Sequence, residues 1–501
     1  MTAKPTRINP NLLLAVLALS GLAYAVLSAI VIPALPALQH DLHTSETGVT
    51  WVLTAYLIAA SIGTSILGRL GDMYGKERVL VWTMVVLTVG TLLAAVAQSL
   101  AVLVVARALQ GAAGGIYPLA FGIVRDEFPR ERIAGSIGML SAILGVGGGV
   151  GIVAAGVIIE NMSWHWLFWF PLFVTVAAAV AVWRFVPESP VRVPGRVNWL
   201  AAAVMAVGIS MLLFAVSETT LWGWGSVKTI GLLAGGLAVC ALWIAIEVRS
   251  AVPLVDMTMM RIRGVWTTNL AAFLLGAGMY ASFIIIPQFA QLPKRTGFGY
   301  GASVVVSGLY LLPATMGMMA MSMLAGRIAL RYGSRRSLIA GSAVSTCAFV
   351  LLLVLGHGHA QMLIAAGLIG IGIGLAFAAL GNLIVGAVPP QQTGIASGMN
   401  TVMRLLGGAL GGQLSATFIA GHIAHGLPAV GGFTETFAVS AAFLLVCVAA
   451  SLLVPRGPSR FEATAAESRA EVEATAAEPR APARGTVRAG VGDGAAEALN
   501  S

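Results

Sequence analysis

A charged loop between two apolar runs carries the most suggestive residue pattern in this chain. The loop, residues 68–80, reads GRLGDMYGKERVL, and its glycines allow a tight turn and a close approach of helix ends. An acid placed like Asp72 can pair with a cation or face a helix N-terminus, and such a contact can form in one conformation and break in another. We interpret Gly68, Asp72, Gly75 and Arg78 as a conformational latch. The alternative is an ordinary cationic loop with an incidental acid.

Two lone arginines interrupt long apolar runs. Arg107 lies in LVVARALQGAAGG, residues 103–115, and has no acid within one helical turn. An arginine inside a membrane-spanning helix is expensive and usually functional. The alternative is that Arg107 donates to a backbone carbonyl or extends its head group to the interface. Arg404, in a later apolar run, is expected to line a cavity or to order neighbouring helices.

A third pattern is the glycine-rich run 138–156, GMLSAILGVGGGVGIVAAG. Its glycines Gly145, Gly149, Gly151 and Gly156 recur at spacings that bring small residues onto the faces of one helix. Such faces allow two helices to pack closely within a bilayer. Packing alone is a sufficient explanation for any one of these glycines.

The elements that position these residues are long and apolar. The chain has 501 residues, of which 58% are hydrophobic and 10% are charged, and its mean hydropathy is +0.90. Apolar runs of about 20 residues are typical of membrane-spanning helices. We predict fourteen spans, at 12–34, 49–68, 78–97, 100–122, 136–158, 165–186, 198–216, 229–248, 266–288, 302–324, 336–356, 361–384, 395–418 and 436–454.

The cationic residues lie mainly in alternate loops. With the N-terminus inside, the inner loops and the N-terminal segment hold eighteen Lys and Arg residues, whereas the outer loops hold Lys228, Lys294 and Arg295. Because cationic loops stay in the cytosol, this bias predicts that both termini are cytosolic. The same distribution leaves no contiguous basic face, which argues against a nucleic-acid partner despite the net charge of +9.

The charged loop occurs twice. Residues 326–338, GRIALRYGSRRSL, repeat the pattern of 68–80, with Leu330 opposite Asp72. An internal duplication of this kind is typical of transporters that carry a substrate site between two repeats. It predicts an N-terminal six-helix bundle at 12–186, a linker with two extra helices at 187–264, and a C-terminal six-helix bundle at 265–455. Residues 1–11 are expected to be cytosolic, and 456–501 a disordered cytosolic tail.

Three segments together resemble the major facilitator superfamily. The loop 68–80 resembles that family's signature between helices 2 and 3. Arg107, Gln110 and Gly111 resemble its R-x-x-Q-G signature in helix 4. Residues 151–156 resemble the G-P-x-x-G-G core of the antiporter signature in helix 5, although Ile152 replaces the proline and Ala155 replaces a glycine. With the span count and the aromatic segment 163–171, the chain is most similar to the fourteen-span drug:proton antiporter branch.

This resemblance implies an all-α membrane protein of the major facilitator fold. It also implies proton-coupled export of small hydrophobic or amphipathic compounds by alternating access. The expected setting is the bacterial plasma membrane, and the partners are a small-molecule substrate, protons and lipid. No cofactor, metal, enzymatic activity or obligate protein partner is expected. The alternative is an exporter of one endogenous metabolite or lipid that is not coupled to protons.

The chain departs from that branch in helix 1, where Leu27 occupies the position that is often acidic before Ala34-Leu35-Pro36. No Asp or Glu lies deep in any predicted span. By resemblance, Arg107 takes part in a proton relay. Glu160 is the first candidate for its titratable group, followed by Asp41.

The substrate cavity is expected to be apolar and aromatic with few polar groups. Aromatic faces suit hydrophobic or cationic compounds. For each candidate alone, a packing or lipid-facing role is an equally good explanation. The candidates are Tyr56, Gln110, Tyr117, Tyr280, Gln288, Tyr310, Asn400 and Arg404.

Overall fold

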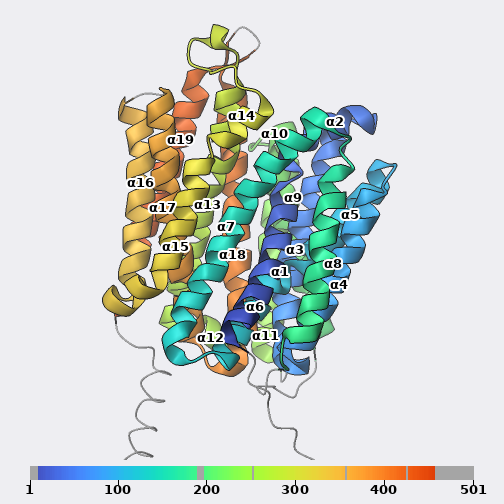
Figure 1. The fold of residues 1–501 in the computed structure, drawn as a ribbon, viewed down its shortest axis with the longest axis vertical. Helices are drawn as coiled ribbons and strands as arrows, with labels where there is room; N and C mark the ends of the chain where they lie inside the picture. Colours follow the sequence, from blue (N-terminus) through green and yellow to red (C-terminus); the bar gives the residue numbers. More distant parts are fainter. Residues whose placement is uncertain (1–8, 189–196, 251–252, 356–357, 425–426, 457–501) are drawn as a thin grey trace, which may run out of the picture.

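The computed structural model describes residues 9–188, 197–250, 253–355, 358–424 and 427–456. These residues form a helical bundle whose long helices run between two opposite ends (Figure 1). The helix α1 begins and α19 ends at the lower end in Figure 1, which we call the terminal end. The opposite end is called the far end. The predicted tail at 456–501, apart from Arg456, and most of the N-terminal segment lie outside the described residues.

The chain can be divided at the two extra helices. The first half contains α1 (Pro10–Ala29), α2 (Leu35–Asp41), α3 (Glu46–Tyr74), α4 (Lys76–Ala95), α5 (Leu100–Ala112), α6 (Ile116–Glu127), α7 (Arg130–Asn161) and α8 (Trp166–Phe185). The inserted segment contains α9 (Trp199–Ser217), α10 (Thr219–Trp222), α11 (Val227–Arg249) and α12 (Met257–Met260).

The second half contains α13 (Arg263–Gln291), α14 (Val304–Leu309), α15 (Leu312–Tyr332), α16 (Ser334–Leu355), α17 (His359–Ala387), α18 (Thr393–Gly421) and α19 (Val430–Ser451). Within the described ranges, 3-10 turns join helices at Ile32–Ala34, Ala113–Gly115, Lys294–Thr296 and Pro390–Gln392. The short strands β1 (Ile423–Ala424) and β2 (Leu427–Pro428) form an antiparallel pair at the far end.

Thirteen of the described helices are long and apolar enough to cross a membrane. The helix α18 is not among them, although it has 29 residues, because glycines and polar residues interrupt its apolar sequence. With α18 included, a helix overlaps each of the fourteen predicted spans. The prediction of an all-α membrane protein is therefore confirmed.

Several spans are not single helices. Within the predicted span 12–34, the first helix ends at Ala29. The predicted span 100–122 is interrupted at Ala113–Gly115, and the predicted span 302–324 is interrupted between α14 and α15. A proline at the start of α15 and glycines before α6 explain the latter two breaks, because neither residue type favours a continuous helix.

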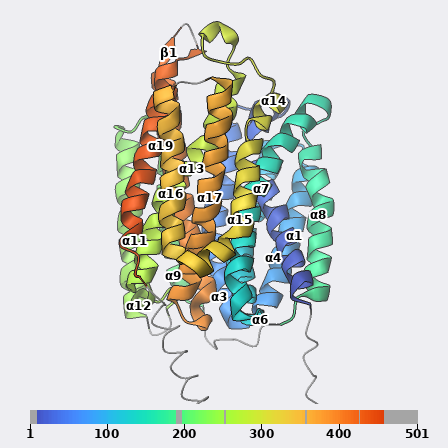
Figure 2. The same cartoon turned by 60° about the vertical axis from the view of Figure 1, so that its left-hand side comes forward.

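The buried apolar side chains form two clusters. One joins the first half with the inserted helices and with buried residues of α17 and α18, and the other lies mainly within the second half but also includes Ala29 and Ile152 of the first half. Between the halves, α3 packs against α18, and α7 packs against α15 and α17. Figure 2 shows α7 and α15 side by side along their lengths. These two seams position the residues that the sequence singles out.

Candidate functional site

Asp72 connects the two halves at the terminal end. Its side chain is fully buried, and its carboxylate accepts hydrogen bonds from the backbone N–H groups of Gly394 (3.3 Å) and Ile395 (3.2 Å). Both groups belong to the first turn of α18, where the helix dipole favours a negative charge. The acid of the first repeat thus caps a helix of the second half.

A buried lysine supports this contact. Lys76 Nζ lies 2.6 Å from Asp126 Oδ2 and 3.8 Å from Asp72 Oδ1, and all three side chains are buried. The hydrocarbon stem of Lys76 lies where a side chain at Gly122 would otherwise fit. Two carboxylates therefore share one cation. These contacts lie within the first half, so they hold Asp72 in place independently of its contact with α18.

A second contact across the seam comes from Arg125. Its guanidinium donates to Thr393 Oγ1 at 2.7 Å and to the Val388 carbonyl at 2.8 Å. Both acceptors flank the turn that precedes α18. The start of α18 is therefore held by an acid and by a cation from the first half.

The remaining latch residues shape the turn. Gly75 has φ 104°, a conformation that glycine adopts readily, and Gly333 at the matching position of the second repeat has φ 83°. Arg78 Nε lies 2.8 Å from Glu188 Oε1, and this ion pair is largely exposed. In the second repeat, Arg335, which precedes the counterpart of Arg78 by one residue, donates to the Ser451 and Leu452 carbonyls at the end of α19.

Gly68 lies against the backbone of α18. A Cβ at Gly68 would lie 2.5 Å from the Gly394 carbonyl oxygen, and a Cβ at Gly394 would lie 2.4 Å from the Gly68 oxygen. We expect Gly394→Val to separate the seam, because overpacking of this kind typically costs about 1–3 kcal/mol. Export should fall roughly tenfold, since 1.4 kcal/mol corresponds to about a factor of 10.

The separation can be measured as the distance between spin labels on α3 and α18 at the terminal end. Gly231→Val on α11 is the matched control, because nothing lies within 4 Å of its Cβ position. An unchanged distance distribution for Gly394→Val would show that the seam does not depend on this close approach.

Arg107 lies inside the first half and is fully buried. Its Nε donates to the Val52 carbonyl at 3.2 Å, and its Nη1 donates to the Leu27 carbonyl at 2.9 Å and to Gln110 Oε1 at 2.8 Å. Its Nη2 has no hydrogen-bond partner among the described residues. The guanidinium therefore reaches α1 at Leu27, the position where an acid was sought and is absent. It donates there to the main-chain carbonyl and not to a side-chain carboxylate.

Aromatic rings surround this guanidinium. Its Cζ lies 4.2 Å from the centroid of the Tyr56 ring, and Tyr24 stacks on Tyr56 with centroids 6.0 Å apart. Tyr117 meets Tyr24 edge to face at 6.2 Å and donates its hydroxyl to the Gly21 carbonyl. Tyrosine faces attract a cation without neutralising it.

Arg404 lies on α18 of the second half and is held beside an aromatic ring in the same way. Its Cζ lies 4.7 Å from the centroid of the Phe377 ring, and its buried Nε makes no hydrogen bond with the described residues. The Tyr280 ring lies one turn further along α18, where it fills the space that a side chain at Gly408 would occupy. We call this group the central cluster; its members are Tyr24, Tyr56, Arg107, Gln110, Tyr117, Tyr280, Phe377 and Arg404.

The other cavity candidates lie elsewhere. Asn400 is buried within the second half and donates to Asn269 Oδ1 at 3.0 Å and to the Thr268 carbonyl. Tyr310 bonds His359 near the far end, and Gln288 is exposed. The structure therefore groups Tyr56, Gln110 and Tyr117 around Arg107 and Tyr24 in the first half, and places Tyr280 and Arg404 one turn apart along α18 in the second half. Tyr24 and Phe377 were missed, although Tyr24 is the one tyrosine of the first predicted span.

The glycines of α7 face two different helices. A Cβ at Gly145 or Gly149 would collide with Met318 or Thr315 of α15, whereas a Cβ at Gly151 would lie 2.7 Å from the Val26 carbonyl of α1. Gly156 is buried further along α7. The run thus lets one helix approach its own half and the opposite half at the same time.

The proposed proton carriers do not meet in this structure. Glu160 is exposed at the far end of α7, where its carboxylate accepts from the Val305 N–H at 3.3 Å. Asp41 lies at the end of α2 with its carboxylate 3.0 Å from His40 Nδ1. Among the described residues, neither acid is hydrogen-bonded or ion-paired to Arg107. A third acid, Glu218 of the inserted segment, is buried at the far end, and burial raises the pKa of its carboxyl.

The inserted helices bridge the two halves on one side of the bundle. Thr54 of α3 bonds Ser217 at 2.9 Å, and Gln413 of α18 donates to the Ser217 carbonyl. Trp224 Nε1 donates to Thr417 Oγ1 of α18 at 2.9 Å. The end of α9 and the loop after it therefore cover the α3–α18 seam at the far end.

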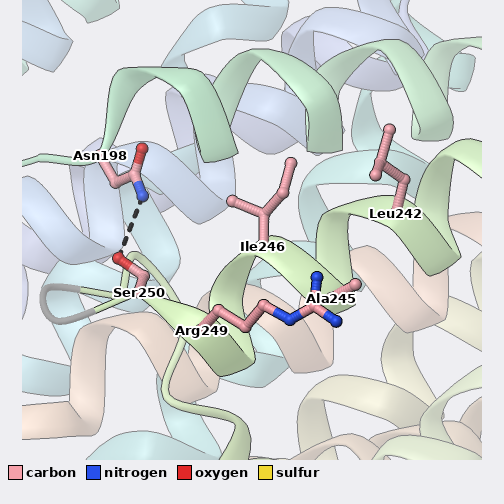
Figure 3. A pocket seen from close by; sticks show the side chains of 6 residues that line it. All are labelled: Asn198, Leu242, Ala245, Ile246, Arg249 and Ser250. Atoms are coloured by element: carbon pink, nitrogen blue, oxygen red, sulfur yellow. Dashed lines mark hydrogen bonds between the residues drawn. The ribbon is translucent and has the colours of Figure 1, made fainter.

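A cavity of about 310 Å³ lies at the terminal end of the inserted pair. In Figure 3, Asn198 Nδ2 donates a hydrogen bond to Ser250 Oγ at 3.2 Å on one side of it, while Ile246 and Arg249 project from α11. Its lining contains no member of the central cluster. We therefore do not treat it as the substrate site.

The sequence matches the model of the Major Facilitator Superfamily over residues 17–412, with a second match over 268–490. The chain belongs to the Major Facilitator Superfamily. Its membership and the multi-span helical structure establish it as a membrane protein of this superfamily. The predicted family is confirmed.

Curated relatives of this superfamily chain come from several bacteria. An uncharacterised MFS-type transporter of Mycobacterium tuberculosis is 28% identical over 416 residues, which are 82% of this chain and 59% of that protein. The chain thus spans 59% of the length of this relative. Multidrug resistance protein 3 of Bacillus subtilis is 27% identical over 73% of this chain and 71% of that protein. The tetracenomycin C resistance and export protein of Streptomyces glaucescens is 25% identical over 80% and 74%.

Among solved structures, the human organic anion transporter MFSD10 (TETRAN) superposes with a TM-score of 0.64. The match covers 89% of this chain and 100% of that chain, at 15% sequence identity. At this identity the likeness shows the major facilitator fold alone.

Proposed function

We propose that this chain exports small hydrophobic or amphipathic compounds across a bacterial plasma membrane by alternating access, with protons moving inward. The observation that carries the proposal is the contact of Asp72 with the start of α18. This contact joins the two halves at the terminal end, and the same helix, α3, carries Tyr56 of the buried aromatic cluster. Relatives that are named for multidrug resistance and for export of tetracenomycin C support the substrate class.

In this proposal the terminal end faces the cytosol, because the cationic loops lie there. The Asp72 contact, the Arg125 contacts and the Gly68–Gly394 approach close that end. They must break for a compound to enter the central cluster from the cytosol. Breaking several contacts together gives two discrete states rather than a gradual opening.

The test is transport by the purified protein in proteoliposomes across a panel of amphipathic compounds, with proton movement recorded at the same time. We expect compound-dependent proton flux. Transport of a compound without any accompanying proton flux would contradict proton coupling but would still agree with an exporter. Absence of transport across the panel would contradict the export of such compounds.

Proton coupling requires a group that can be reached from both sides, and Glu160 remains our first proposal. Its carboxylate is exposed at the far end and touches the start of α14, so protonation would weaken a contact between the halves. We expect the transport rate of the wild type to change roughly tenfold or more between acidic and neutral external pH. Glu160→Gln should remove most of this pH dependence.

Asp41→Asn and Glu218→Gln are the matched comparisons in the same pH series. If Glu160→Gln keeps the wild-type pH profile and Glu218→Gln loses it, the relay lies in the inserted segment instead. The raised pKa of the Glu218 carboxyl places its titration closer to neutral pH than that of a free glutamate.

Export of one endogenous metabolite or lipid is the second candidate. A cavity of about 230 Å³ with an almost entirely apolar lining lies between α7 and α15, lined by Gly149, Val153 and Thr315 among others. An acyl chain would fit such a surface. Comparing the compounds exported by cells with and without the gene distinguishes this candidate from a multidrug exporter.

A further inference from the structure

The cavity of about 310 Å³ between α9 and α11 changes from polar to apolar along α11. Asn198, Arg249 and Ser250 line it at the ends of the two helices, whereas Ile246 and Leu242 line it one and two turns further from that end. Seven residues of an α-helix span about 10 Å. A molecule in this cavity therefore meets a polar, cationic end and a hydrocarbon wall.

The face of α11 that lines the cavity carries a cation and no acid. Its four lining residues recur at positions i, i+3, i+4 and i+7, which share one side of a helix. They are Leu242, Ala245, Ile246 and Arg249. Glu247 lies on the other side of α11, where its carboxylate accepts from Trp243 Nε1 and from two backbone N–H groups after the helix. The acid is therefore engaged away from the cavity.

Arg249 is exposed, and its guanidinium makes no hydrogen bond or ion pair with any described residue. Two other arginines at the terminal end differ in this respect, because Arg78 pairs with Glu188 and Arg125 donates to Thr393. A guanidinium has five N–H donors in a planar fork. At Arg249 these donors are open to a ligand in the cavity.

The inserted pair lies at the lipid-facing surface of the molecule. Figure 2 shows α11 at the outer edge of the bundle, where it packs chiefly against α9. Only 17% of the residues in its most apolar stretch are buried, the smallest share among the thirteen candidate spans of the described residues. Trp199, next to Asn198, is 64% exposed, as is typical of tryptophans at the level of lipid head groups.

We propose that this cavity binds the head group of an anionic phospholipid, with the phosphate at Arg249 and the glycerol region against Ile246 and Leu242. Guanidinium and phosphate form strong, charge-assisted hydrogen bonds. Basic pockets between membrane-spanning helices are typical sites for anionic head groups. The assignment to the cytosolic leaflet rests on the orientation given in the proposed function, whereas binding itself does not depend on export.

The size of the cavity agrees with a head group. Its volume of about 310 Å³ lies at the lower end of the roughly 300–1,000 Å³ that is usual for ligand sites. The acyl chains therefore remain outside, along the exposed apolar side chains of α11. Asn198 and Ser250 already join the ends of the inserted helices through a hydrogen bond of 3.2 Å, and a head group beside them strengthens this connection.

The experiment measures lipid binding by the purified full-length protein with native mass spectrometry. The probes are phosphatidylglycerol, which is anionic, and phosphatidylethanolamine with identical acyl chains, each with and without inorganic phosphate as competitor. The variants are Arg249→Gln, Arg249→Lys and Ala245→Leu, which fills the cavity and keeps the charge. Arg130→Gln is the matched control, because Arg130 is an exposed arginine at the same end that does not line the cavity.

We expect wild type to prefer phosphatidylglycerol. Arg249→Gln should weaken its binding about fivefold, the effect of one arginine at an anionic surface. Ala245→Leu should weaken it as well, Arg249→Lys should retain part of the affinity, and Arg130→Gln should behave as wild type. Phosphatidylglycerol binding that Arg249→Gln leaves unchanged, or equal binding of the two lipids, overturns the proposal.

Inorganic phosphate distinguishes a lipid from a soluble phosphate compound. We expect it to compete weakly, because it gains nothing from the apolar wall. Complete displacement of the lipid by phosphate would assign the site to a soluble anion and overturn the lipid assignment. Since lipid binding is measured without transport, a negative result here leaves the proposed export intact, and absence of export contradicts the proposed function alone.

Discussion

Replacing Asp72 by asparagine is expected to reduce export to background while the protein still reaches the membrane in normal amounts. The carboxylate accepts from two backbone N–H groups of α18 and faces the positive end of that helix. Asparagine removes the charge and presents an NH₂ group to one of these donors. Hydrogen bonds to charged groups contribute about 1.5–3 kcal/mol, which corresponds to a shift of roughly 10- to 150-fold in the equilibrium between closed and open states.

The measurement is export from cells that express each variant at matched levels. Glu131→Gln is the control, because Glu131 is an exposed acid in the first turn of α7 at the same end. Export at the wild-type rate by Asp72→Asn would mean that the α18 contact is structural and not part of the transport cycle.

Replacing Lys76 by methionine is expected to cause the largest loss of stability. Lys76 Nζ is buried between Asp126 at 2.6 Å and Asp72 at 3.8 Å, so methionine leaves two buried carboxylates without their shared cation. Removing one partner of a buried ion pair typically costs about 3–5 kcal/mol. The midpoint of thermal unfolding in detergent should fall clearly, and the yield of folded protein with it.

The double variant Lys76→Met/Asp126→Asn tests the cause. If uncompensated charge is responsible, removing one carboxylate should recover part of the lost stability. A single variant that unfolds at the wild-type temperature would show that solvent reaches this group and that its charges are screened.

The loop 68–80 shows how far sequence reasoning extends into the site. The choice of Asp72 required only local sequence, and its two possible partners, a cation and a helix N-terminus, both occur in the structure. The helix that it caps could not be identified, because the Gly394 contact lies 322 residues away in sequence. Lys76 and Asp126 show the same limit, since a charged residue near a helix end gives no sign of burial.

The central cluster was only partly predictable. The alternatives for Arg107 included bonds to backbone carbonyls, and it does donate to those of Leu27 and Val52. Whether it also relays a proton remains a prediction. Tyr24 was missed because a single tyrosine in an apolar run gives no periodic signal. Gln288 was assigned to the cavity by type and depth, and its exposure depends on the rotation of α13, which the sequence does not determine.

The position of the inserted helices has a consequence for compounds that dissolve in lipid. The two halves meet along two seams, and the Ser217 and Trp224 contacts place the inserted segment over the α3–α18 seam. The α7–α15 seam carries an apolar cavity between its helices. For the proposed exporter we therefore expect one-sided lateral access at the far end: a hydrophobic compound would approach between α7 and α15, because the inserted segment covers the opposite seam there.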